Sequence, residues 1–456
     1  MDRAKIVSFL LILFIAISDS PAPGQQVFSS VRISSTFNPV GSGARAMGMG
    51  GAFIAVADDA TAASWNPGGL IQLETPEVSV VYSCFHWRDD YSSRFHSEAA
   101  GMNETTGDDL NYLSAALPFQ LFRKNFVASV NFQRLYDMYK DLGFDYNFAG
   151  RFTDGTPWNL LLSENFRQQG GIKAFSPAIA YQVTPRLSIG ATFNIWTDNL
   201  FWDNEWTETT RATGHGTLGS LPIETNTLTY EKFSNFEGFN MNLGFLWDMT
   251  RVITIGGVFK TPFTAHIDHS YSFFSGEFYP TLSRSVSNSF SYTDSMRIKM
   301  PASYGLGIAF RFSDALTCSF DIYRTQWSDF FRVIRGYKQL FGDDEYSDID
   351  NRARYQSIVH DTTQIRTGIE YLVILDETII PLRFGLFYDP RPSHQHPHDF
   401  YGFSVGSGFM YANLVIDYAY QFRTGKNVEG GVLGIPNTKA DIDQHTFLIS
   451  MIYHFD

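Results

Sequence analysis

The segment Ala412–Arg423, ANLVIDYAYQFR, changes character at every second residue. One set of positions is apolar: Leu414, Ile416, Tyr418, Tyr420 and Phe422. The same period of two runs through Ala302–Phe312 and through the C-terminal stretch Phe447–Phe455. Successive side chains of a β-strand point to opposite faces of its sheet, so this period predicts strands with one strongly apolar face.

The connections between such segments alternate in length. From residue 76 onward about fourteen strands can be counted by this criterion. Short connections at Leu121–Asn125, Thr184–Arg186, Asp248–Arg251, Ser313–Asp314, Leu375–Glu377 and Met410–Ala412 alternate with long ones near 88–109, 137–172, 198–236, 266–297, 328–358, 389–399 and 424–443. Alternation of this kind is typical of an outer-membrane barrel with short periplasmic turns and long outer loops, whereas a β-sandwich has no reason to sort its loops. We therefore predict an all-β fold, a 14-stranded antiparallel transmembrane β-barrel, over residues 76–456.

Composition narrows the function classes. The 456-residue chain has a formal charge of −13, which argues against a nucleic-acid binder, because such proteins need a basic face. Its two cysteines exclude a disulfide scaffold or a Cys-rich zinc module. The chain is also rich in aromatic residues and low in charge, as expected of a membrane β-structure.

The N-terminus predicts export. Arg3 and Lys5 precede the apolar run Ile6–Ile17, which is too short for a spanning helix but suits the core of a signal peptide. We expect residues 1–24 to be that signal peptide and the mature protein to lie in the bacterial outer membrane.

Residues 25–75 do not share the strand pattern. The stretch TFNPVGSGARAMGMGGAFIAVADDATAASWNPGGLIQL, residues 36–73, is rich in Gly and Ala. Asp58 or Asp59 can cap a short helix over Ala60–Ser64, and the turn Asn66-Pro67-Gly68 can end it. A barrel of the predicted size leaves a lumen that its own side chains cannot fill, so we expect this segment to plug it as a small hatch with short helices.

The segment Gly43–Leu70 resembles the N-terminal hatch of the FadL/TodX (OMPP1) family of outer-membrane transporters for hydrophobic compounds. Its Ala-Asp-Asp element and its Asn66-Pro67-Gly68, where the family has Asn-Pro-Ala, stand at the family's spacing. Further similarity lies at Met300–Phe312, Arg324–Phe330, Ile380–Ser393 and Asp399–Gly408. The chain departs from the family by ending Phe455-Asp456 rather than on an aromatic residue.

The resemblance implies passive uptake of a long-chain fatty acid or a small hydrocarbon. The ligand would bind at an external apolar groove and pass to a lumenal pocket. Movement of the hatch, with a kink in the third strand near Asn125–Leu135, would then open a lateral exit. No energy source and no cofactor are implied. The expected surroundings are outer-membrane lipid and lipopolysaccharide, and the expected state is a monomer.

Two expected outer loops are unusually apolar, which favours a hydrophobic ligand on independent grounds. Large exposed apolar side chains in water indicate either a binding groove or a packed loop core, and both alternatives remain open. The residues that would line the groove are Leu200, Phe201, Trp202, Trp206, Phe273, Phe274 and Phe278.

Three basic residues stand at alternate strand positions whose side chains should face the lumen, and they are candidates for binding a fatty-acid carboxylate: Arg383, Arg366 and Lys299. Acidic residues stand at further positions of this kind, so a structural ion-pair network is the alternative. The cluster His394-Gln395-His396-Pro397-His398 has alternate histidines, but Pro397 limits their convergence, and we expect no metal site.

No catalytic motif with positional support occurs, so the protein is not expected to be an enzyme. Two further hypotheses stay open. One is a partner protein of the same fold for secretion or assembly, and the other is a general hydrophilic porin.

Overall fold

A computed structural model describes residues 41–94, 97–198, 200–334, 344–347, 352–393, 396–429 and 438–455. The predicted signal peptide, the start of the predicted hatch, and His394 with Gln395 lie outside these ranges. Among the described residues, no helix has the length and apolar character that a membrane-spanning helix requires.

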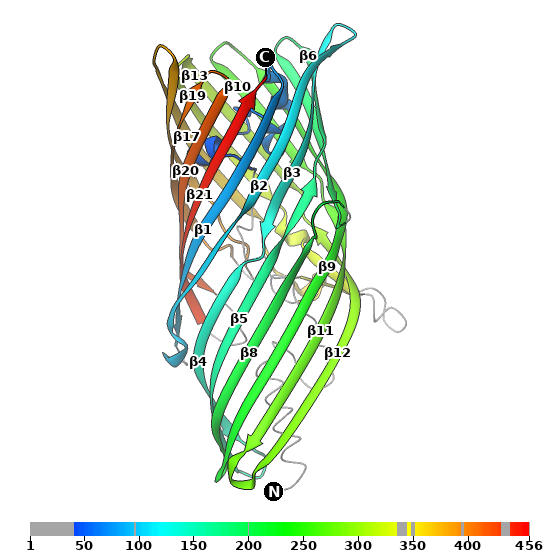
Figure 1. The fold of residues 1–456 in the computed structure, drawn as a ribbon, viewed down its shortest axis with the longest axis vertical. Helices are drawn as coiled ribbons and strands as arrows, with labels where there is room; N and C mark the ends of the chain where they lie inside the picture. The colour runs from blue at the N-terminus through cyan, green and yellow to red at the C-terminus, as the bar shows by residue number, and fades with distance from the viewer. Residues whose placement is uncertain are drawn as a thin grey trace.

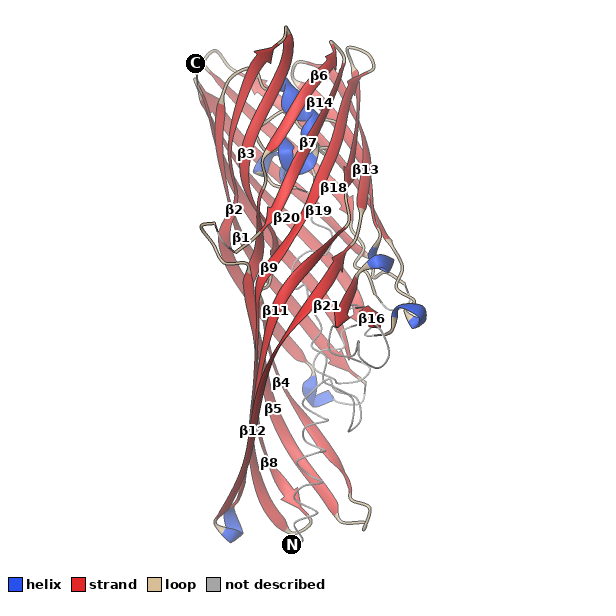
Figure 2. Ribbon diagram, turned by 90° about the vertical axis from the view of Figure 1, so that its right-hand side faces the viewer, coloured by secondary structure: helices blue, strands red, loops and turns tan. Residues whose placement is uncertain are grey.

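The chain forms one long antiparallel β-structure with short helices inside one end (Figures 1 and 2). The helical elements are α2 (Ala44–Gly48), α3 (Ala62–Trp65), η1 (Pro67–Gln72), η2 (Ser97–Ala99), η3 (Pro280–Leu282), η4 (Trp327–Asp329) and η5 (Arg354–Gln356). The strands are β1 (Glu77–Ser93), β2 (Gly101–Leu121), β3 (Lys124–Asp137), β4 (Lys140–Arg151), β5 (Pro157–Phe175), β6 (Ala178–Thr184), β7 (Leu187–Trp196), β8 (Glu205–Leu218), β9 (Leu221–Asp248), β10 (Ile253–Lys260), β11 (Phe263–Tyr279), β12 (Arg284–Met300), β13 (Ser303–Ser313), β14 (Leu316–Thr325), β15 (Phe331–Ile334), β16 (Asp344–Ser347), β17 (Thr362–Ile374), β18 (Thr378–Tyr388), β19 (Phe400–Tyr411), β20 (Leu414–Glu429) and β21 (Thr438–His454).

Within the described part of the chain, strand pairing closes a ring of 16 strands and leaves five strands outside it. The ring runs β1, β2, β3, β6, β7, β5, β8, β9, β10, β13, β14, β17, β18, β19, β20 and β21, and the pairing of β21 with β1 closes it. Toward the short turns, β7 also pairs directly with β9, from Leu187↔Trp247 to Trp196↔Gly238. The strands outside the ring are β4, β11, β12, β15 and β16.

The prediction of a 14-stranded barrel is therefore wrong. Segments expected as outer loops, near 137–172, 198–236 and 266–297, are largely strands, and β5 and β8 enter the ring. The physical reason is the solvent. Away from the membrane the outward face of a strand meets water, so segments such as Thr207–Thr217 carry polar residues outward and lose the apolar alternation on which the count depended.

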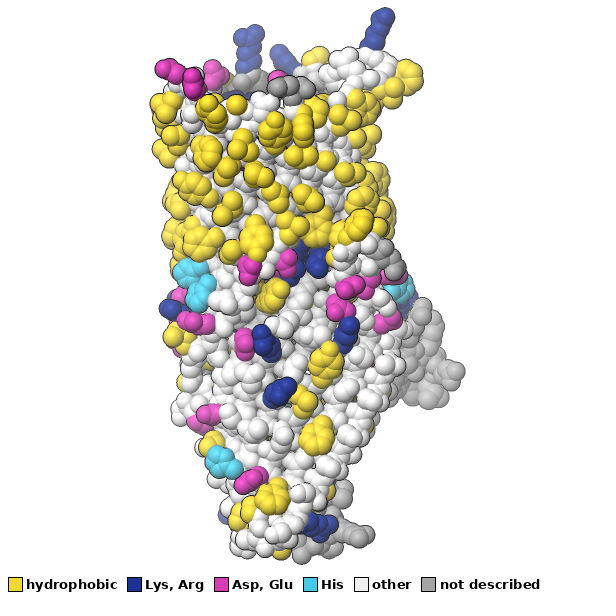
Figure 3. Space-filling model, in the orientation of Figure 1, with side chains coloured by type: hydrophobic (Ala, Val, Ile, Leu, Met, Phe, Trp, Pro, Cys, Tyr) yellow, Lys and Arg dark blue, Asp and Glu magenta, His cyan; other side chains and the backbone are white. Residues whose placement is uncertain are grey.

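An apolar belt surrounds the barrel beside its short turns (Figure 3). On strand after strand, an outward-facing apolar side chain is exposed there: Tyr82, Leu117, Val130, Ile179, Ile189, Leu243, Phe259, Leu306, Ile369, Leu382, Val405, Tyr418 and Ile449. A band of this kind, with aromatic residues among its members, is the lipid-facing surface of a membrane barrel. Beyond it, most outward positions are polar or charged, as with Glu237, His266 and Asp268, so β11 and β12 lie outside the membrane.

Residues 41–73, here called the lumenal segment, sit inside the belt-bearing end of the barrel (Figure 2). Its apolar side chains, among them Phe53, Trp65 and Leu70, form a buried core with Val127 and Ala180 of the wall. The wall in front of it is built from glycines. A Cβ on Gly256 would lie 2.4 Å from Ile54 O, one on Gly190 2.3 Å from Pro67 O. Glycine is required at these places because backbone packs directly on backbone.

Candidate functional site

The lumenal segment is held by buried ion pairs. Arg383 on β18 donates from Nε to Glu370 Oε2 and from Nη1 to Asp417 Oδ1, both at 2.6 Å. Glu370 also accepts from Nε and Nη2 of Arg45 on α2, at 3.0 and 2.9 Å. Arg45 in turn pairs with Asp58 at 2.6 Å. The network therefore ties three strands of the wall, β17, β18 and β20, to the segment inside it.

The four predicted hatch residues all lie in this segment. Asp59 Oδ1 accepts from Thr61 N at 2.8 Å, just before α3, which begins two residues later than predicted. Asn66 donates from Nδ2 to Ile54 O and to Phe245 O of the wall, each at 2.8 Å. Pro67 follows it at the start of η1, with its carbonyl against β7.

The other two predicted cations also have acidic partners. Arg366 donates from Nη1 to Gly50 O at 2.9 Å and lies 3.5 Å from Asp389. Lys299 on β12 pairs with Glu345 on β16. The structure places Arg366 and Arg383 at the lumenal segment, and Lys299 on a strand outside the membrane. Their binding of a ligand carboxylate stays a prediction.

A large apolar cluster fills the barrel interior farther from the short turns. Along β9, Gly244 contacts the lumenal segment, Asn240 and Asn242 follow, and Phe236 and Phe233 then join the cluster. Here the name lumenal apolar cluster is used for its buried members: Met138, Ile172, Ala174, Trp196, Trp206, Phe233, Phe236, Ala265, Ile267, Met296, Ile298, Met300, Trp327, Phe330 and Val359. Its aromatic rings stack, with Trp206 and Phe233 centroids 4.6 Å apart.

Polar side chains separate this cluster from the lumenal segment. Asn194 Nδ2 donates to Asn242 Oδ1 at 3.2 Å, and Trp196 Nε1 donates to Asn240 Oδ1 at 2.9 Å. A cavity of about 50 Å³ opens here, lined by these residues and by Lys260, whose Nζ lies 5.7 Å from the ring centre of Tyr323. This layer is not among the predicted site residues, although the inward-facing positions of β7, β9 and β10 could locate it from the sequence.

Strand β3 is irregular beside these cavities. Its register with β5 shifts between Arg134 and Tyr136, which makes Leu135 a bulge. Leu135 lines the 50 Å³ cavity and also a second one of about 150 Å³, which reaches Gly41, Trp65 and Asp389. An apolar cavity of ~150 Å³ is large enough for benzene, but this one also has charged walls.

The predicted groove residues do not come together at one place. Trp206 is buried in the lumenal apolar cluster and Phe273 is buried beside Phe290, with ring centroids 5.3 Å apart. Phe274 and Phe278 are exposed on β11, and Phe201 is 94% exposed. Leu200 is exposed as well, while Trp202 packs edge-on against Phe132 at 4.7 Å. Among the described residues no group of three potential metal ligands occurs.

Comparison with known proteins identifies the family. The model of the outer membrane protein transport protein family (OMPP1/FadL/TodX) matches residues 33–431. No curated protein matches the chain. Similar solved structures include the CymD monoaromatic hydrocarbon channel, at 17% identity and a TM-score of 0.52 over 92% of this chain and 99% of that one.

Two further structures share the fold. A Pseudomonas aeruginosa FadL homologue is 14% identical, with a TM-score of 0.56 over 91% of this chain and 99% of that chain. The Pseudomonas putida toluene transporter TodX is 15% identical, with a TM-score of 0.52 over 92% and 100%. These relatives are transport channels rather than enzymes. With its outer-membrane barrel and the family match across most of its length, the chain belongs to the OMPP1/FadL/TodX family of outer membrane transport proteins.

Proposed function

We propose that this protein is a passive uptake channel for small hydrophobic compounds. The observation that carries the proposal is the lumenal apolar cluster, because a channel for polar solutes lines its interior with polar and charged groups. Fifteen buried apolar residues, five of them Trp or Phe in β7, β8, β9 and η4 alone, offer a hydrophobic ligand an extended apolar surface.

The proposed route has four stages. A ligand first meets exposed apolar side chains of the outer region, such as Phe201, Phe274 and Phe278. It next enters the lumenal apolar cluster. Because the adjoining cavity holds only about 50 Å³, side chains or the lumenal segment must move to admit it. The bulge at Leu135, which lines both cavities, supports lateral release through the wall at β3.

The substrate class is a fatty acid or a neutral hydrocarbon, and the ion pairs favour the neutral one. Arg383, Arg366 and Lys299 each lie within ion-pair distance of a carboxylate, so a ligand carboxylate would have to compete for them. The two hydrocarbon channels of the same fold, CymD and TodX, are consistent with this choice. We also propose the chain divisions 1–24, signal peptide; 25–75, hatch; and 76–456, barrel.

Equilibrium binding to the detergent-purified protein tests the proposal. Toluene, oleate and methyl oleate are titrated against the wild type and against Arg383→Gln. We expect saturable toluene binding in both proteins. Loss of oleate but not methyl oleate in Arg383→Gln would make this residue a carboxylate ligand. If none of the three compounds binds the wild type, the uptake function is wrong and the assembly-partner hypothesis replaces it.

A further inference from the structure

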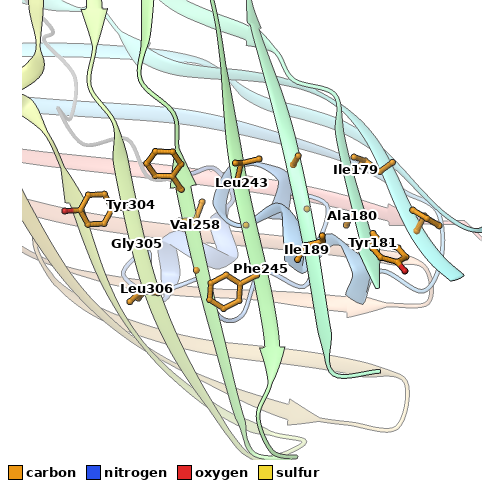
Figure 4. Close-up of a pocket in the computed structure, with 16 residues that line it drawn as sticks. Ile179, Ala180, Tyr181, Ile189, Leu243, Phe245, Val258, Tyr304, Gly305 and Leu306 are labelled. Atoms are coloured by element: carbon orange, nitrogen blue, oxygen red, sulfur yellow. The ribbon is translucent and has the colours of Figure 1, made fainter. Parts of the chain in front are cut away.

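The lipid-facing wall carries a large apolar hollow (Figure 4). It has a volume of about 1030 Å³, at the upper end of the ~300–1,000 Å³ typical of small-molecule sites. Strands β6, β7, β9, β10 and β13 form it together with Phe126 of the neighbouring β3, and none of its lining residues is charged. It lies inside the apolar belt, so in the membrane it faces lipid.

Strand register explains the hollow. Two rows of outward side chains cross the five strands. The row nearer the short turns is Tyr181, Ile189, Phe245, Gly257 and Leu306, and the next row is Ile179, Ala191, Leu243, Phe259 and Tyr304. Gly257 and Ala191 are the small members of these rows. The Phe245 ring lies over Gly257, and the hollow forms where these two positions contribute no large side chain of their own.

The floor of the hollow is also thin. Between the two rows the inward positions are Ala180, Gly190, Gly244, Val258 and Gly305. Behind Gly190 and Gly244, the backbone and side chains of Asn66 and Pro67 lie directly against the wall. The lumenal segment therefore packs against the floor of the hollow from inside the barrel.

Basic residues stand at the rim above it. Arg186 directly precedes β7, three residues and ~10 Å along the strand from Ile189. Arg251 lies in the turn before β10, and the hydrogen bond from Asp248 N to Arg186 O, 2.8 Å, holds the two turns together. Both arginines are exposed, and within the described ranges neither forms an ion pair with a carboxylate. The acidic groups at this rim are Asp248, which accepts from Thr254 Oγ1 at 2.8 Å, and Asp314.

We infer that the hollow binds one anionic phospholipid of the periplasmic leaflet. An acyl chain occupies the uncharged hollow, and the phosphate lies at Arg186 and Arg251. The position of the hollow beside the short turns selects this leaflet, and the two unpaired arginines select a negative head group. This site is independent of the uptake route, because it lies on the outside of the wall and not in the lumen.

Native mass spectrometry of the purified full-length protein, titrated with phosphatidylglycerol or phosphatidylcholine, tests the site. A basic residue near an anionic lipid contributes about fivefold, equivalent to ~1 kcal/mol. We therefore expect one phosphatidylglycerol to bind at least tenfold more tightly than phosphatidylcholine. Arg186→Gln with Arg251→Gln should abolish this preference. These substitutions lie on exposed turns and leave the barrel intact.

A second variant fills the hollow. Ala191→Leu with Gly257→Leu should weaken binding of both lipids at least fivefold, although the Phe245 ring, 2.3 Å from a Cβ on Gly257, must swing into the lipid. Cys84→Leu, a small-to-large change on the outward face of β1, is the matched control and should bind like the wild type. Unchanged binding in the filled variant, equal wild-type affinity for the two lipids, or a dimer in place of a lipid adduct would each overturn the inference.

Discussion

At the scale of single residues, Arg383 links the wall to the segment inside it. Its side chain is fully buried and lies between the carboxylates of Glu370 and Asp417. Glu370 is shared with Arg45, so the lumenal segment depends on a charge that Arg383 helps to neutralise. Removing one member of such a network leaves an uncompensated buried charge, which costs far more than the loss of a surface ion pair.

We predict that Arg383→Gln lowers the free energy of unfolding by about 3–5 kcal/mol. Urea unfolding in lipid vesicles, followed by tryptophan fluorescence, measures the change. Arg324→Gln is the matched control, because Arg324 pairs with Asp361 at an exposed position and its loss should cost ~1 kcal/mol or less. Equal destabilisation by the two substitutions would show that the buried network does not hold the structure together.

A second residue, His269, lies outside the membrane and should make the stability of the protein depend on pH. Its ring is buried and stacks on Phe233, with centroids 4.7 Å apart, while Nδ1 lies 2.8 Å from Asp294 and Nε2 3.1 Å from Glu231. Burial alone would lower the pKa of His269. Hydrogen bonds to the two carboxylates, together with their charges, raise this pKa to about 9.

The direction of the pH effect follows from that pKa. Because the pKa is above the ordinary value of ~6.5, the stabilisation is fully present below pH ~6.5 and is lost as the pH rises through about 9. We expect the free energy of unfolding to fall by about 2 kcal/mol between pH 6 and pH 10 in the wild type and to stay flatter in His269→Gln. Replacing the exposed His266 by Gln on the same strand should leave the pH profile unchanged. If His269→Gln shows the same pH profile as the wild type, His269 is not the group responsible for the pH dependence.

At the scale of elements, β3 is the irregular strand of the wall. The pair Arg134↔Lys173 is followed by Tyr136↔Ile172, so deletion of Leu135 leaves the pairs on both sides in register. The partner strand is also interrupted, because β5 ends at Phe175 and β6 begins at Ala178. The break lies opposite Val130 and Asn131, between the pairs Ser129↔Ala178 and Phe132↔Phe175, so β3 combines a bulge with a nearby interruption of its partner strand, which weakens the wall there.

We predict that deleting Leu135 leaves a folded barrel that binds toluene but takes it up at least tenfold more slowly, because the wall at β3 becomes continuous. Uptake of labelled toluene by cells and binding to the purified protein measure the two properties separately. Deleting Phe312, the exposed extra residue beside the β13–β14 turn, is the control and should affect neither. Normal uptake without Leu135 would exclude lateral release at β3.

The sequence could predict those strands whose outward face is in contact with lipid. In the belt an outward residue must be apolar, so the alternation in Ala412–Arg423 located β20 and the short turns. Outside the belt that requirement disappears, and the pattern predicts loops where β5 and β8 lie. Parity also placed Arg383 and Asp417 in the lumen, but their pairing depends on distances between strands, which a sequence does not contain.

At the scale of the whole molecule, one segment closes a wide barrel. The ring is complete through β1 and β21, so the interior can be sealed only by what lies inside it. The lumenal segment does this by packing backbone against glycine, as at Ile54 O and Gly256, and by hydrogen bonds to the wall such as Asn66 Nδ2 to Phe245 O. At these glycine positions the fit leaves no room for a side chain on the inner face of the wall.

Two neighbouring glycines of β10 allow a matched test of this seal. Gly256 faces Ile54, whereas Gly257 faces the lipid and would meet only the movable ring of Phe245. We predict that Gly256→Val displaces the lumenal segment and produces steady conductance in planar bilayers, while Gly257→Val remains closed like the wild type. Asn66→Ala, which removes the hydrogen bonds to Ile54 and Phe245 without adding volume, should also conduct if Gly256→Val does not fold. Closed channels in both Gly256→Val and Asn66→Ala would mean that contacts other than this backbone packing seal the barrel.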